Sequence, residues 1–150
     1  MKILVPVDGS EHSLRALEVA ADVAKTRGAE IYVISVMASI GGMEDHEISP
    51  KMRERHEETI REHSDKAIRT ACEVLVSCKV DAKVSKTVST AFSVHDAIVD
   101  FAETEKIDLI VIGSRGLSVS SKFKMGSTAY QVVRHSRCSV YLVKLRGEQE

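Results

Sequence analysis

The chain has 150 residues, an ordinary length for one domain, so we expect a single domain over residues 1–150. Its apolar fraction of 43% and charged fraction of 29% are typical of a globular protein. The net charge of −1 predicts no nucleic-acid partner, and the lack of a long apolar run predicts no membrane partner. The three cysteines, Cys72, Cys78 and Cys138, show no CxxC spacing, and the N-terminus shows no signal-peptide pattern. These features predict a cytoplasmic protein with reduced thiols.

The first third of the chain reads as strand, helix and strand. Residues 2–7 form an apolar run that predicts a strand. Ser10 is a typical helix N-cap, and Gly28 is expected to end the helix that it starts. Residues 31–36 predict a second buried strand, and the polar residues 38–49 predict a loop.

The middle third contains a long charged helix and an alternating strand. Ser49-Pro50 predicts a helix start, with serine as the cap and proline in the first helical position. Residues 80–88 alternate between apolar and polar side chains, which is typical of an edge strand. Ser93 with Asp96 three residues later predicts the start of the next helix.

The last third adds a buried strand at residues 109–112, a glycine-bounded loop, a short helix and a final strand at 140–143. Strands separated by helices pair in parallel through right-handed crossovers. The element order therefore predicts an α/β fold with an open, doubly wound, Rossmann-like sheet of five parallel strands and helices on both faces.

The strongest functional pattern is the spacing of glycines after the fourth predicted strand. Gly113 and Gly116 bracket a turn, nine residues follow, and Gly126-Ser127 opens a helix. Successive backbone N–H groups in such a turn, together with the N-terminus of a helix, bind phosphate. In doubly wound sheets ligands bind beyond the carboxyl ends of the strands, where the segment 6–10 should also lie. The alternative is that the glycines serve only the turn and the helix cap. The preceding buried strand and the following helix favour nucleotide binding.

The pattern GxxG, nine residues, then GS resembles the ATP-binding signature of universal stress proteins. The opening KILVPVDGS, the run DLIVIGSRGLS and the closing VVRHSRCSVYLV resemble the same family, so the similarity spans nearly the whole chain. The resemblance to the ATP-binding subclass implies a sheet of order 3-2-1-4-5. It also implies a homodimer joined through the last strand, with Val140, Tyr141, Leu142 and Val143 at the interface.

The same resemblance implies an adenine-nucleotide ligand, either ATP or ADP or AMP, with Mg²⁺ held near Asp8 as an option. Asp8 would contact the ribose or a metal-bound phosphate, and Val36 would meet adenine through its backbone. The residues expected to surround the nucleotide are Pro6, Val7, Asp8, Ser10, Val36, Ile112, Gly113, Arg115, Gly116, Gly126, Ser127 and Thr128.

Three positions depart from the family pattern. Many ATP-binding members carry a hydroxyl residue where this chain has Ala129, so Thr128 is the nearest candidate for a γ-phosphate contact. Family members often have a glycine-x-proline sequence after the third strand. This chain has Thr90-Ala91-Phe92-Ser93 there. The proline common before the final strand is Ser139, which adds an N–H group at the expected dimer edge.

The histidines give no metal or catalytic pattern. His46, His56 and His63 lie in or near the long charged helix at intervals that match no metal motif, so we expect surface side chains.

Three classes of function remain open from the sequence. The first is a nucleotide-binding regulatory or stress-response module. The second is an enzyme, either a slow ATPase or a protein that phosphorylates itself on Ser114 or Ser127. A GxxxxGK(S/T) loop and an obvious base for water are both missing from the sequence, which disfavours the enzyme. The third is a nucleotide-free structural dimer, which the intact glycine signature disfavours.

Overall fold

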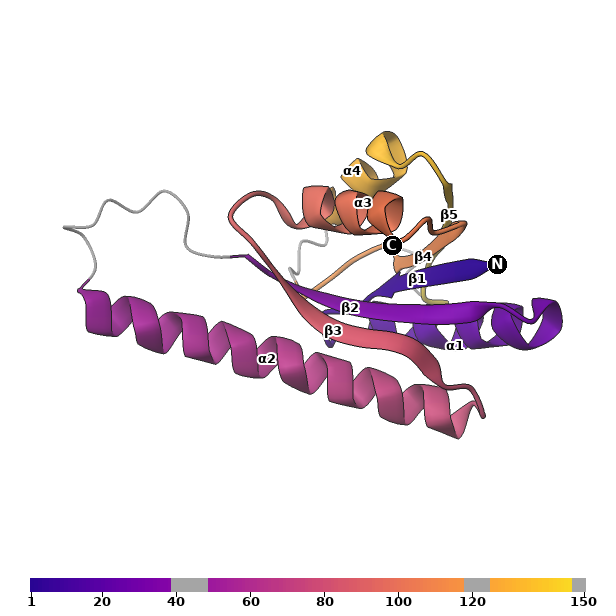
Figure 1. The fold of residues 1–150 in the computed structure, drawn as a ribbon, viewed down its shortest axis with the longest axis horizontal. Helices are drawn as coiled ribbons and strands as arrows, with labels where there is room; N and C mark the ends of the chain where they lie inside the picture. The colour runs from indigo at the N-terminus through magenta and orange to yellow at the C-terminus, as the bar shows by residue number, and fades with distance from the viewer. Residues whose placement is uncertain (39–48, 118–124, 147–150) are drawn as a thin grey trace.

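The computed structural model describes residues 1–38, 49–117 and 125–146. Five parallel strands form one sheet in the order β3-β2-β1-β4-β5 (Figure 1). The strands are β1 (Lys2–Pro6), β2 (Glu30–Ala38), β3 (Ala82–Thr90), β4 (Leu109–Gly113) and β5 (Ser139–Val143). The helices are α1 (Glu11–Arg27), α2 (Pro50–Ser77), α3 (Val94–Thr104) and α4 (Ser127–His135). The doubly wound α/β fold and its strand order are therefore confirmed.

Local capping explains where the first three helices begin. The side-chain oxygens of Ser10, Ser49 and Ser93 each accept a hydrogen bond from the backbone N–H three residues later. Each bond satisfies one of the N–H groups that a helix start leaves unpaired. Gly28 ends α1 with a φ of 64°, a left-handed conformation that glycine adopts without strain.

The sheet is covered on both faces (Figure 1). Side chains alternate along each strand, so successive residues enter different cores. On one face, α1 and α2 pack over a core that includes Ile3, Val5 and Val33. On the other face, α3 and α4 pack over a core that includes Leu4 and Ile34.

The predicted start of the third strand differs from the structure at the turn between α2 and β3. The third strand begins at Ala82 and not at Val80. Val80 lies three residues after the end of α2 at Ser77, and its N–H donates to the carbonyl of Leu75. Lys79 precedes it with a φ of 60°, which turns the chain out of the helix. The expected loop at 38–49 lies outside the described residues except at its two ends.

The paths that leave β1 and β4 create the place for a ligand. The chain passes from β1 to α1 on one face and from β4 to α4 on the other. Neighbouring strands whose connections leave in opposite directions open a crevice at their carboxyl ends. None of the helices in the described part of the chain is long and apolar enough to cross a bilayer.

Candidate functional site

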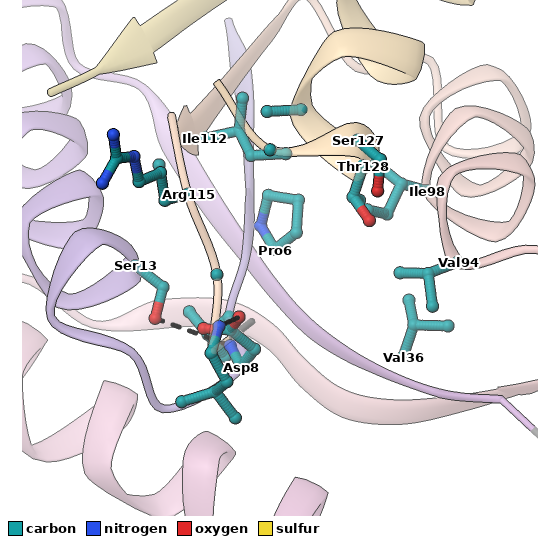
Figure 2. Close-up of a pocket in the computed structure, with 16 residues that line it drawn as sticks. Pro6, Asp8, Ser13, Val36, Val94, Ile98, Ile112, Arg115, Ser127 and Thr128 are labelled. Carbon is teal, nitrogen blue, oxygen red and sulfur yellow. Dashed lines mark hydrogen bonds between the residues drawn. The ribbon is translucent and has the colours of Figure 1, made fainter. Parts of the chain in front are cut away.

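A cleft of about 270 Å³ lies at the carboxyl ends of β1 and β4 (Figure 2). It is built from the β1–α1 turn, the end of β2, the start of α3 and the segments on both sides of the β4–α4 loop. Its lining residues are Pro6, Val7, Asp8, Ser13, Val36, Val94, Ile98, Ile112, Gly113, Arg115, Gly116, Leu117, Gly126, Ser127, Thr128 and Ala129.

One side of the cleft is apolar. Figure 2 shows Val36 from β2 beside Val94 and Ile98 from α3, with Pro6 between this group and Asp8. Ile98 is 1% exposed and belongs to the core beneath α3, so its position is fixed by packing. A rigid apolar wall of this kind suits the face of a planar ring.

The opposite side is organised around the carboxylate of Asp8. Its Oδ1 accepts the N–H of Ser10 at 2.9 Å, and its Oδ2 accepts the N–H of Leu117 at 3.2 Å. The second bond joins the β1–α1 turn to the loop after β4. A β-carbon at Gly116 would lie 2.5 Å from Asp8 Oδ2, so only glycine leaves room for this arrangement.

Gly113 has a different steric role. A β-carbon there would lie 2.7 Å from the His12 β-carbon and 2.9 Å from its carbonyl carbon, both in the first turn of α1. The missing side chain lets the end of β4 approach α1 closely. Gly113 therefore sets the spacing between the two segments that frame the cleft.

The third glycine, Gly126, lies at the N-terminus of α4. Gly126 is the N-cap residue, and its own N–H donates to the carbonyl of Ser114 at 2.7 Å. This bond brings the two ends of the glycine loop together and leaves the first N–H groups of α4 at the cleft. Ser127 and Thr128 line the cleft there, whereas Ala129 is 3% exposed and also packs in the core.

The structure brings eleven of the twelve expected residues together in the cleft. The exception is Ser10, which is buried as the N-cap of α1 and supports the cleft only by donating its N–H to Asp8. Arg115 lines the cleft, but its guanidinium points away from Val36, Ser127 and Thr128 (Figure 2).

Five lining residues were not expected from the sequence, namely Ser13, Val94, Ile98, Leu117 and Ala129. Val94 and Ile98 carry the apolar spacing of a core-facing helix, and that spacing does not distinguish a core contact from a cleft wall. Ser13 carries a clearer signal, because a serine one turn after a cap can bond back to the turn. Its Oγ donates to the Ser10 carbonyl at 2.9 Å.

His63 is exposed on α2 as expected, but it also contacts the site. Its Nε2 lies 3.0 Å from the carbonyl oxygen of Asp8. The sequence places His63 on the same helix face as the buried residues Ala67, Ala71 and Leu75, which follow it at intervals of four, but that spacing does not name its partner. His46 lies outside the described residues.

Across residues 1–38, 49–117 and 125–146, no three His, Cys, Asp or Glu side chains lie close enough together to hold a metal ion.

Comparisons with known proteins agree with this architecture. The model of the universal stress protein family matches residues 1–144. The chain belongs to the universal stress protein family. A universal stress protein of Methanocaldococcus jannaschii is 30% identical over 150 residues, covering 95% of this chain and 81% of the relative.

Two solved structures of universal stress proteins share the fold. One from Lactobacillus plantarum has a TM-score of 0.82 at 24% identity and covers 95% of this chain and 97% of its own. One from Archaeoglobus fulgidus, determined in complex with dAMP, has a TM-score of 0.69 at 25% identity and covers 96% of this chain and 98% of its own.

Proposed function

We propose that this universal stress protein binds an adenine nucleotide in the cleft, with ATP among its ligands, and acts as a regulatory module and not as an enzyme. The observation that carries the proposal is that one cleft joins a rigid apolar wall to the N-terminus of α4. The adenine ring would lie against Val36, Val94 and Ile98. The phosphates would take the N–H groups near Ser127 and Thr128.

The Archaeoglobus fulgidus relative supports the ligand class, because it was determined with dAMP. That nucleotide has adenine, a deoxyribose and one phosphate. ATP as a ligand of this chain rests instead on the spacing GxxG, nine residues, then GS, and on the N–H groups at the N-terminus of α4.

A Mg²⁺ ion fits the proposal through Asp8. Magnesium is commonly held by one or two carboxylates together with the phosphates of a nucleotide. Each carboxylate oxygen of Asp8 accepts one backbone N–H and keeps lone pairs for a cation. The ion would neutralise part of the phosphate charge.

The lining residues favour binding over hydrolysis. Asp8 is the only acidic side chain among the described lining residues, and no histidine, lysine or cysteine is among them. If Asp8 holds the Mg²⁺ ion, the described lining residues include no second carboxylate that could remove a proton from water. Ser114, one of the two residues considered for self-phosphorylation in the alternative enzyme hypothesis, is 0% exposed.

The test is calorimetric titration with ATP, ADP, AMP and GTP, with and without Mg²⁺, alongside an assay for ADP release. We expect micromolar dissociation constants for adenine nucleotides, which correspond to about −8 kcal/mol, and ADP release no faster than the protein-free control. No binding of any adenine nucleotide at millimolar concentration would refute the proposal in favour of a nucleotide-free protein. Sustained ADP release that depends on Asp8 would instead establish the enzyme.

A further inference from the structure

A side chain of α2 holds the turn that presents Asp8. His63 Nε2 lies 3.0 Å from the carbonyl oxygen of Asp8, a residue 55 positions earlier in the chain. A carbonyl oxygen can only accept a hydrogen bond, so the Nε2 atom carries the proton and donates it. The bond is therefore available in the neutral tautomer with hydrogen on Nε2 and in the protonated imidazole.

The bond acts on a peptide of the turn that adjoins a glycine. The carbonyl of Asp8 belongs to the peptide that joins it to Gly9, and Gly9 has a φ of 82°. Because glycine accepts positive and negative φ about equally, this peptide can rotate at low cost unless another group fixes it. A rotation would change ψ of Asp8 and φ of Gly9, the torsions that place the Ser10 N–H beside the Asp8 carboxylate.

Two contacts leave the Asp8 carboxylate little room to move. Its Oδ2 must reach the N–H of Leu117 and pass the unsubstituted α-carbon of Gly116. The backbone N–H of Asp8 is held only weakly, with Ser13 Oγ at 3.5 Å. The bond from His63, at 3.0 Å, is thus shorter than the bond made by the Asp8 N–H.

We propose that His63 is a positioning residue for nucleotide binding, which fixes the Asp8–Gly9 peptide and thereby aims the Asp8 carboxylate into the cleft. This inference rests on the proposed function. His63 itself does not line the cleft, so its effect on a nucleotide passes through Asp8.

The helix that carries His63 is anchored independently of this bond. Ala67, Ala71 and Leu75 are buried beneath α2. Asp65 accepts a hydrogen bond of 2.8 Å from the Thr87 hydroxyl on β3. Replacing the exposed His63 ring should therefore leave α2 in place and remove only the donor.

The test compares His63→Met with His63→Gln. Both side chains are unbranched, neutral and good helix formers, but only glutamine can donate a hydrogen bond. With ATP and Mg²⁺, we expect His63→Met to weaken binding about threefold to tenfold, the effect of losing one hydrogen bond. His63→Gln should restore most of the affinity. The control His56→Met changes an exposed histidine on the same helix and should bind as the wild type does.

A double-mutant cycle decides whether the effect passes through Asp8. In an Asp8→Asn background, His63→Met should change affinity by less than about twofold, because the carboxylate that His63 positions has been removed. Equal losses in both backgrounds would overturn the positioning role, as would wild-type binding by His63→Met. Either result leaves nucleotide binding by the wild type standing.

A ligand-free measurement separates this inference from the proposed function. The backbone amide NMR signals of Gly9 and Ser10 should shift in His63→Met and return towards the wild-type values in His63→Gln. Unchanged signals in His63→Met would overturn the inference even if the wild type bound no nucleotide.

Discussion

The carboxylate of Asp8 lies against the α-carbon of Gly116, so that a β-carbon there would be 2.5 Å from Asp8 Oδ2. The contact joins the β1–α1 turn to the glycine loop. The carboxylate can take this position only because residue 116 has no side chain. Gly113, the first glycine of GxxG, is required for a different reason, because a side chain there would collide with the backbone of α1.

Replacing Gly116 with valine should abolish ATP binding while the helical content stays unchanged. The new side chain displaces the Asp8 carboxylate and breaks its bond to the Leu117 N–H. Titration calorimetry and circular dichroism measure the two effects. A matched control is Gly28→Ala, which strains a residue with a φ of 64° far from the cleft and should lower the melting temperature without changing affinity. Undiminished affinity in Gly116→Val would contradict the assignment of the loop.

Ser114→Ala should leave the protein equally stable or make it more stable. The hydroxyl is 0% exposed and has no hydrogen-bond partner among the described residues. An unpaired buried polar group costs about 1–3 kcal/mol, so its removal offsets the lost contacts of the oxygen atom. Urea denaturation measures the change. A loss of more than about 1 kcal/mol would mean that the hydroxyl is paired in solution.

Lys79→Gly should stabilise the fold by up to about 1 kcal/mol. Lys79 follows the last turn of α2 with a φ of 60°, a conformation that costs an ordinary residue roughly 1–2 kcal/mol. Glycine removes that cost but adds entropy to the unfolded chain, so the net gain is smaller. Thermal unfolding should show a rise of a few degrees. The same change at the exposed Lys83 within β3 should lower the melting temperature.

Local signals in the sequence predicted the elements well, because their causes are local. Ser10, Ser49 and Ser93 each cap a helix through a bond to an N–H group three residues away. The strand order was a different kind of inference. The alternation of strands and helices implied a parallel sheet, but the order 3-2-1-4-5 came from the family resemblance.

The cleft was predicted best where a residue follows a strand and least well where a helix supplies a wall. The glycines could be predicted because a close approach of two backbone segments, or of a side chain to the backbone, requires a residue without a side chain. The spacing of Val94 and Ile98 predicts core residues. Ile98 does lie in the core, but both side chains also line the cleft. The bond from His63 to Asp8 depends on how α2 crosses the sheet, which only the tertiary packing determines.

Thr128→Val should weaken ATP binding about threefold to tenfold while AMP binding changes little. Valine keeps the shape of the side chain and removes the hydroxyl that would take the place of the one missing at Ala129. Thr128 lines the cleft beside the N-terminus of α4, where the phosphates would lie. Parallel titrations with ATP and AMP measure the ratio. Equal losses for the two nucleotides would place Thr128 near the base, the ribose or the α-phosphate instead of the terminal phosphate.

We propose that the chain forms the homodimer that the family resemblance implies, and Tyr141→Lys should dissociate it. β5 forms one edge of the sheet, and a lysine on an edge strand opposes pairing with a second strand. Tyr141 is 49% exposed, whereas Val140 and Leu142 pack partly against the core beneath α3 and α4, and Val143 is 4% exposed. Charges at Val140 or Leu142 would therefore weaken the fold as well as the dimer, and Tyr141 gives the cleaner test.

Ser85→Lys places the same charge on β3, the opposite edge, at a position that is already exposed. Light scattering coupled to size-exclusion chromatography should then show a dimer for the wild type and for Ser85→Lys, and a monomer for Tyr141→Lys. A wild type that is monomeric at high concentration would refute the interface directly. Loss of the dimer in both variants would mean that the added charge, and not the β5 edge, causes the dissociation.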